Sequence, residues 1–189
     1  MRIKMELFMK NNPLKNLVLS ALFLGLGLTL PFLTGQIQSI GNMLLPMHLP
    51  VFLCGLICGW QYGLTVGFIL PLLRSLLFTM PVMYPAAIAM AFELATYAFT
   101  VGFIYSRSRW KCIKTLYRAM LIAMVLGRIV WGIAQAILLG VGGKAFTLAA
   151  FVSGALINAI PGIILQLILI PIIMVALNRA KLVPLFKKQ

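Results

Sequence analysis

Long apolar stretches alternate with short links along this chain, and they predict helices that cross a membrane. A helix of about 20 predominantly apolar residues spans the hydrocarbon core of a bilayer. We predict six segments, of which the second is short, and the links leave no room for a separate folded unit. The segments are approximately Leu17–Thr34, His48–Gly59, Tyr62–Phe78, Ala86–Tyr105, Ala119–Val141 and Leu148–Leu177. The pattern therefore favours an all-α membrane protein, with one compact six-helix bundle as a single domain over residues 1–189.

The composition supports a membrane location and argues against a soluble domain. Hydrophobic residues make up 62% of the chain, charged residues only 10%, and the mean hydropathy is +1.07. A soluble domain of this composition would expose too much apolar surface. The net charge of +14 is compatible with nucleic-acid binding. However, the positive residues flank the apolar segments and do not line a polar face, so we exclude a nucleic-acid partner.

The lysines and arginines outside the apolar segments predict the orientation of the bundle. With six spans, the N-terminal tail, the loop between the fourth and fifth segments (Arg107–Arg118) and the C-terminal tail lie on one side. All three are basic, whereas the opposite side keeps Lys144. Because positive loops stay in the cytoplasm, we expect both termini to be cytoplasmic.

Three charged residues interrupt the apolar segments and mark the candidate site: Arg74, Glu93 and Arg128. A charge at the centre of a bilayer costs ~2.5–3.5 kcal/mol on insertion scales, so such residues face a partner or a polar cavity. At ~1.5 Å of rise per residue, Arg74 and Gln135 lie ~9 Å from the outer edge. Glu93, Asn158 and Arg128 lie ~13, ~15 and ~20 Å deep. Residues from four helices are thus expected to meet in the outer half of the membrane.

The balance of charge in this layer indicates an anionic ligand. Two arginines face one glutamate, so pairing leaves about one positive charge unanswered. A buried unpaired cation is costly, and a guanidinium binds a carboxylate in a two-pronged geometry. We therefore expect a site for a small carboxylate-bearing solute that opens to the outside. The alternative is that Arg74 and Glu93 form a pair that locks two helices, while the Arg128 side chain extends toward the membrane surface.

Further polar and aromatic residues are candidates for the same site. His48 lies at the outer start of the second segment and Asn42 lies in the polar stretch before it. Tyr97 and Trp131 are aromatic candidates for the chamber wall. For His48, Tyr97 and Trp131 a packing role is the alternative. Cys54 and Cys58 lack the other ligands of a metal site, so we expect no metal or cofactor.

Small residues on the first segment form a candidate docking face for a partner. Ala21 and Gly25 are spaced four residues apart, and Ser20 lies beside them. Small residues at this spacing allow two helices to approach closely in lipid. Packing within the bundle is the alternative role for this face.

Three motifs resemble a known family of transport proteins. They are Leu45–Gly55, Pro71–Ser75 and Ala89–Tyr97, within a chain of six predicted spans and 189 residues. Together they look like the substrate-binding S component of an energy-coupling factor (ECF) vitamin transporter. Within that family the chain resembles the branch that includes pantothenate-specific components.

The resemblance implies a function and a set of partners. S components bind a vitamin or precursor from outside and pair with a membrane-embedded coupling subunit and two cytoplasmic ATPases. The expected location is the bacterial plasma membrane, and ATP would be hydrolysed by the partners. The loop over residues 35–47 would act as a lid. The family's docking face on the first helix typically has two alanines four residues apart, whereas this chain has Ala21 and Gly25.

Two other classes of membrane protein are alternatives to an S component. An intramembrane enzyme would need a nucleophile with a base, paired acids or a metal, and the chain has one histidine and one membrane glutamate. A self-sufficient secondary carrier would usually contain internal repeats with broken helices, which we do not find. Besides pantothenate binding, two alternative functions remain. One is an S component for a different vitamin, and the other is a small stand-alone carrier.

Overall fold

The computed structural model describes residues 13–34, 45–108, 110–143, 147, 159–180 and 187–188. Its helices are α2 (Pro13–Thr29), α4 (His48–Ile57), α5 (Trp60–Phe78), α6 (Ile88–Arg107), α7 (Ile113–Val141) and α9 (Ile160–Arg179). A 3-10 turn, η1 (Leu30–Thr34), extends α2, and a π-helical turn, η2 (Met83–Ala87), precedes α6. Two-residue strands β1 (Trp110–Lys111) and β2 (Lys187–Lys188) pair antiparallel.

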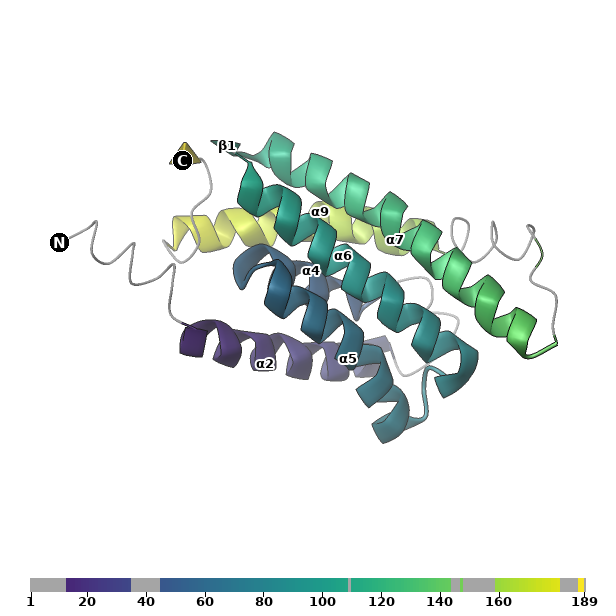
Figure 1. The fold of residues 1–189 in the computed structure, drawn as a ribbon. Helices are drawn as coiled ribbons and strands as arrows, with labels where there is room; N and C mark the ends of the chain where they lie inside the picture. Colours follow the sequence, from purple (N-terminus) through teal and green to yellow (C-terminus); the bar gives the residue numbers. More distant parts are fainter. Residues whose placement is uncertain are drawn as a thin grey trace.

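The prediction of an all-α membrane protein is confirmed. Among the described residues, five helical stretches are long and apolar enough to cross a membrane, and α4 is a shorter apolar helix. The elements run back and forth along one direction, so that α2 begins and α9 ends at the end of the bundle that carries β1 (Figure 1). An even number of crossings, as the distribution of basic residues requires, agrees with this arrangement.

The fifth segment differs in extent from the prediction, and the sixth is described only in part. α7 begins at Ile113, not at Ala119, so Lys114 and Arg118 belong to its first two turns and the predicted basic loop is shorter. Lysine and arginine favour helices, and near a helix end their charged groups reach the membrane surface, which hydropathy does not register. α9 is described only from Ile160, so the predicted beginning of the sixth segment lies outside the described residues.

The tight turn between α4 and α5 depends on a glycine. Gly59 has a φ of 101°, a conformation that other residues adopt at a cost. The turn allows α4 and α5 to run antiparallel within a few residues of chain.

The backbones of α5 and α6 touch at a second glycine, Gly67. α6 packs against α4, α5 and α7, and its contact with α5 is among the most extensive in the structure. A Cβ atom added at Gly67 would lie 2.6 Å from the backbone oxygen of Leu94 on α6. No side chain can fit there, so the absence of one lets the two helices approach closely. α6 is thereby held at a fixed depth against α5, which positions the polar residues described below.

We expect Gly67→Ala to destabilise the bundle, because the neighbouring group is backbone and cannot turn aside. Overpacking of this kind costs about 1–3 kcal/mol. The measurement is the unfolding midpoint of the purified protein in detergent. Gly25→Ala is the matched control, since a Cβ there meets open space, and it should leave the midpoint unchanged or slightly raised. Equal midpoints for the two variants would contradict this account of the α5–α6 contact.

Candidate functional site

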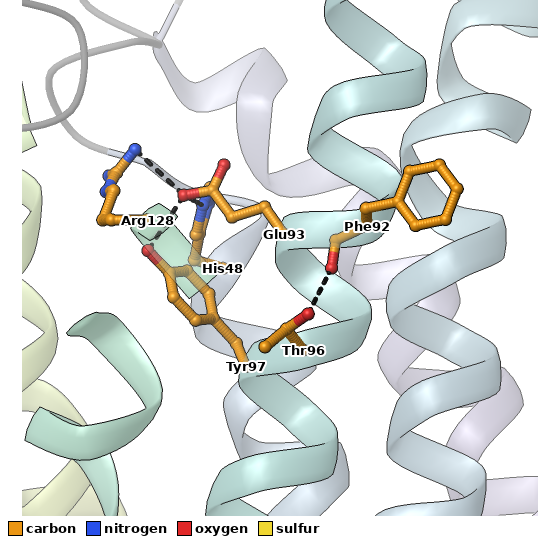
Figure 2. Close-up of polar contacts among 6 residues, drawn as sticks. All are labelled: His48, Phe92, Glu93, Thr96, Tyr97 and Arg128. Carbon is orange, nitrogen blue, oxygen red and sulfur yellow. Dashed lines mark hydrogen bonds and ion pairs between the residues drawn. The ribbon is translucent and has the colours of Figure 1, made fainter. Parts of the chain in front are cut away.

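Four polar side chains from three helices meet inside the bundle, and we call them the Glu93 cluster. Glu93 and Tyr97 come from α6, His48 from α4 and Arg128 from α7 (Figure 2). One oxygen of Glu93, Oε1, lies 2.9 Å from Arg128 Nη1 and accepts a hydrogen bond of 2.9 Å from the Tyr97 hydroxyl. The Nε2 atom of His48 lies 3.8 Å from the same oxygen. The cluster therefore has one carboxylate at its centre.

Helix periodicity and one glycine explain how α6 and α7 present these groups. Glu93 and Tyr97 are four residues apart, so they share one face of α6. A Cβ atom added at Gly127 would lie 2.1 Å from the ring of Tyr97. The glycine thus makes room for the ring beside Arg128, the next residue on α7. The ring of Tyr97 also stacks on Phe52 of α4, with centroids 5.1 Å apart.

A tight turn before α4 places His48. Leu45 has a φ of 50°, and its carbonyl accepts a hydrogen bond of 3.0 Å from the backbone N–H of His48. The imidazole ring then lies 5.4 Å from the ring of Tyr97. Among the described residues, neither ring nitrogen of His48 has a hydrogen-bond partner.

Burial makes the electrostatics of the cluster strong. Glu93 is 1% exposed and Arg128 is 9% exposed, so both charges are largely removed from water and lipid headgroups. Their ion pair offsets a desolvation cost that each charge alone would bear. The guanidinium uses only one edge for this pair. Its Nε and Nη2 atoms are buried and have no hydrogen-bond partner within the described part of the chain.

Arg74 lies in a different environment from Arg128. Its Nη1 atom donates a hydrogen bond of 2.6 Å to the carbonyl of Leu28, in the last turn of α2. Its guanidinium also lies 5.4 Å from the ring centroids of Phe32 and of Phe78. A cation at the C-terminal end of a helix is stabilised by the helix dipole. Arg74 therefore joins α2 to α5, and the carboxylate of Glu93 pairs with Arg128 instead.

Of the other residues predicted to bind the ligand, the structure describes some and leaves others outside the described residues. Gln135 lies two turns beyond Arg128 on α7, and its Oε1 is buried without a partner among the described residues. Trp131 is half-buried on the same helix. Asn42 and Asn158 lie outside the described residues. Within the described chain, no group of three or more His, Cys, Asp or Glu side chains is placed to hold a metal ion.

The residues of the predicted docking face on α2 point in two directions, some into the bundle and some away from it. Ser20 is buried, donates a hydrogen bond to the carbonyl of Asn16 and accepts a long one from the thiol of Cys54 on α4. Ala21 is exposed, and the space beside Gly25 is open. A small-residue face that looks outward thus consists of Ala21 and Gly25.

Sequence reasoning missed two residues that shape the site, Phe52 and Gly127. Both lie in apolar stretches where they resemble ordinary packing residues. The position of Gly127 directly before the membrane arginine Arg128 is the signal in the sequence that points to it.

Comparison with known families places most of the chain in one of them. The family model described as ECF transporter, substrate-specific component, matches residues 15–174. Neither a search of curated proteins nor a search of solved structures found a match. The matched region includes all four residues of the Glu93 cluster.

We expect Arg128→Gln and Glu93→Gln each to destabilise the protein by about 3–5 kcal/mol, because each leaves the other charge buried and unpaired. The double variant should lose less than the sum of the two. The measurement is a double-mutant cycle of unfolding in detergent. Arg118→Gln is the control, since Arg118 lies exposed on the same helix. Additive losses would show that the two side chains do not interact.

Proposed function

The chain belongs to the substrate-specific components of ECF transporters, and we propose that its solute is a small carboxylate-bearing vitamin or precursor, best represented by pantothenate. Members of this family are substrate-binding subunits of transporters. The proposal concerns the chemical class of the solute, its contacts in this chain and the subunits that drive uptake.

The observation that carries the proposal is the edge of Arg128 that has no hydrogen-bond partner among the described residues. Nη1 is engaged by Glu93, while Nε and Nη2 are buried without hydrogen-bond partners among the described residues. These two nitrogens lie on one edge of the guanidinium plane, where their N–H groups point the same way. A carboxylate accepts two parallel hydrogen bonds from such an edge. Buried donors without partners are costly, and a carboxylate solute would satisfy both. These contacts favour Arg128 over Arg74 as the ligand cation.

Other groups of pantothenate, its hydroxyls and its amide, have candidate partners near the cluster. Gln135 lies about 10 Å from Arg128 along α7, at ~1.5 Å per residue, and has a buried unpartnered oxygen. His48, Tyr97 and Trp131 would contact the solute around the carboxylate. Arg74, Asn42 and Asn158 remain predicted contacts from the sequence.

The proposed transporter contains partners that this chain does not supply. We propose that a membrane-embedded coupling subunit docks on α2 and that two cytoplasmic ATPases drive uptake across the bacterial plasma membrane. The open face at Ala21 and Gly25 supports the first part, because small residues allow a partner helix to approach closely. Ser20 would support this face from inside.

Mass spectrometry of small molecules retained through purification tests the class of solute directly. We expect a carboxylate-bearing vitamin or precursor in the protein fraction and its absence from a mock purification. A retained cationic vitamin, or none together with no measurable binding of pantothenate, would contradict the proposal.

We expect Arg128→Lys to weaken pantothenate binding roughly ten- to hundredfold, because lysine keeps the charge but loses the two-pronged edge. A hydrogen bond to a charged group contributes about 1.5–3 kcal/mol, and about 1.4 kcal/mol is tenfold in Kd. Equilibrium binding in detergent measures the effect. Arg118→Lys, an exposed position on the same helix, is the control and should bind normally. If Arg74→Lys weakens binding instead, Arg74 is the ligand cation.

A separate prediction concerns the docking face. We expect Ala21→Leu to reduce co-purification with the coupling module, because the larger side chain blocks close helix approach. Pantothenate binding by the isolated chain should be unaffected. Ala136→Leu is the matched control, an exposed alanine on α7. Equal co-purification of both variants would place the docking surface elsewhere.

A further inference from the structure

The charge balance of the Glu93 cluster changes when a carboxylate arrives. Glu93 and Arg128 form a pair with no net charge, and the pair is largely buried. A carboxylate on the Nε–Nη2 edge of Arg128 would therefore add one uncompensated negative charge inside the membrane. Buried charges persist when each is matched by an opposite one, so the loaded site needs one further positive charge, either a second cation or a proton on one of the carboxylates.

His48 is the group that can supply this cation. It is fully buried, and its Nε2 lies 3.8 Å from Glu93 Oε1. Neither ring nitrogen has a hydrogen-bond partner within the described residues, so both can hold a proton and donate it. The titratable or charged side chains that face it are Glu93 and Tyr97 from α6 and Arg128 from α7 (Figure 2). Of these groups, imidazole is the one whose ordinary titration lies near neutral pH.

We infer that binding of a carboxylate solute is coupled to the uptake of one proton from water by His48. In the empty site the charge of Glu93 is already matched by Arg128, so an imidazolium would be an unmatched cation. In the loaded site the two cations, Arg128 and protonated His48, match the two carboxylates. The inference rests on the proposed function, because only an anionic solute creates the need for the proton.

The chain contains one histidine, which allows a direct measurement. Protein labelled with ¹⁵N-histidine and carrying a tag without histidine gives NMR signals from His48 alone. At neutral pH we expect a neutral ring in the empty protein and a ring protonated at both nitrogens after pantothenate is added. The alcohol analogue, in which a hydroxymethyl group replaces the carboxylate, should leave the ring neutral.

Binding thermodynamics provide a second measurement. Calorimetry in buffers of different ionisation enthalpy should show about one proton taken up per pantothenate bound. By linkage, a ligand that binds with one proton loses affinity as pH rises, so the apparent Kd should increase by up to about tenfold per pH unit. This dependence of Kd on pH should occur in the pH range between the titration midpoint of His48 in the empty protein and its midpoint in the loaded protein. His48→Gln should remove both the proton uptake and the pH dependence.

The outcomes separate this inference from the proposed function. If the protein binds neither pantothenate nor another carboxylate, both fail. If it binds a carboxylate while the labelled ring stays neutral and no proton is exchanged, the coupling is overturned and the proposed function stands. If proton uptake persists in His48→Gln, the proton resides on another group, Glu93 or the solute carboxylate, and the role of His48 is also overturned. The labelled unmodified protein decides the matter even if His48→Gln fails to fold.

Discussion

The ion pair between Glu93 and Arg128 is the interaction on which the rest of the site depends. It joins α6 to α7 through two charges that are largely removed from water. In low-dielectric surroundings neither charge is stable alone, so the pair fixes how these helices face each other. The pair also determines which N–H groups of Arg128 are left for other contacts. Within the described part of the chain, Glu93 contacts only one edge of the guanidinium, and the Nε and Nη2 donors of the other edge have no hydrogen-bond partner. Arg128 would thus combine this structural role with the proposed binding of the solute.

Much of the fold could be predicted from the sequence because the bilayer restricts what a chain can do. Apolar length predicts helices that cross it, and basic links predict which ends lie together. Both predictions agree with the arrangement of α2 to α9. The boundaries were less accurate where charged residues continue a helix beyond the apolar region. Lys114 and Arg118 lie in α7 for this reason, although hydropathy assigns them to a loop.

The partner of Glu93 could not be predicted, because depth along a helix does not determine direction around it. Arg74 and Arg128 were both placed within reach of Glu93 by counting residues. In the structure, α5 turns Arg74 toward the end of α2, where a carbonyl and two phenylalanine rings surround it. Ser20 illustrates the same limit, since it turns toward α4 while its neighbour Ala21 faces outward. Such orientations follow from packing between helices, which a single sequence does not display.

The glycine contact between α5 and α6 restricts which parts of the protein can rearrange as a solute enters. Where main chains touch without intervening side chains, sliding or rotation would produce an immediate steric clash. Those two helices are therefore expected to behave as a rigid frame throughout the transport cycle. Entry and release of the solute would then require elements other than α5 and α6 to move, while these two helices keep their relative position.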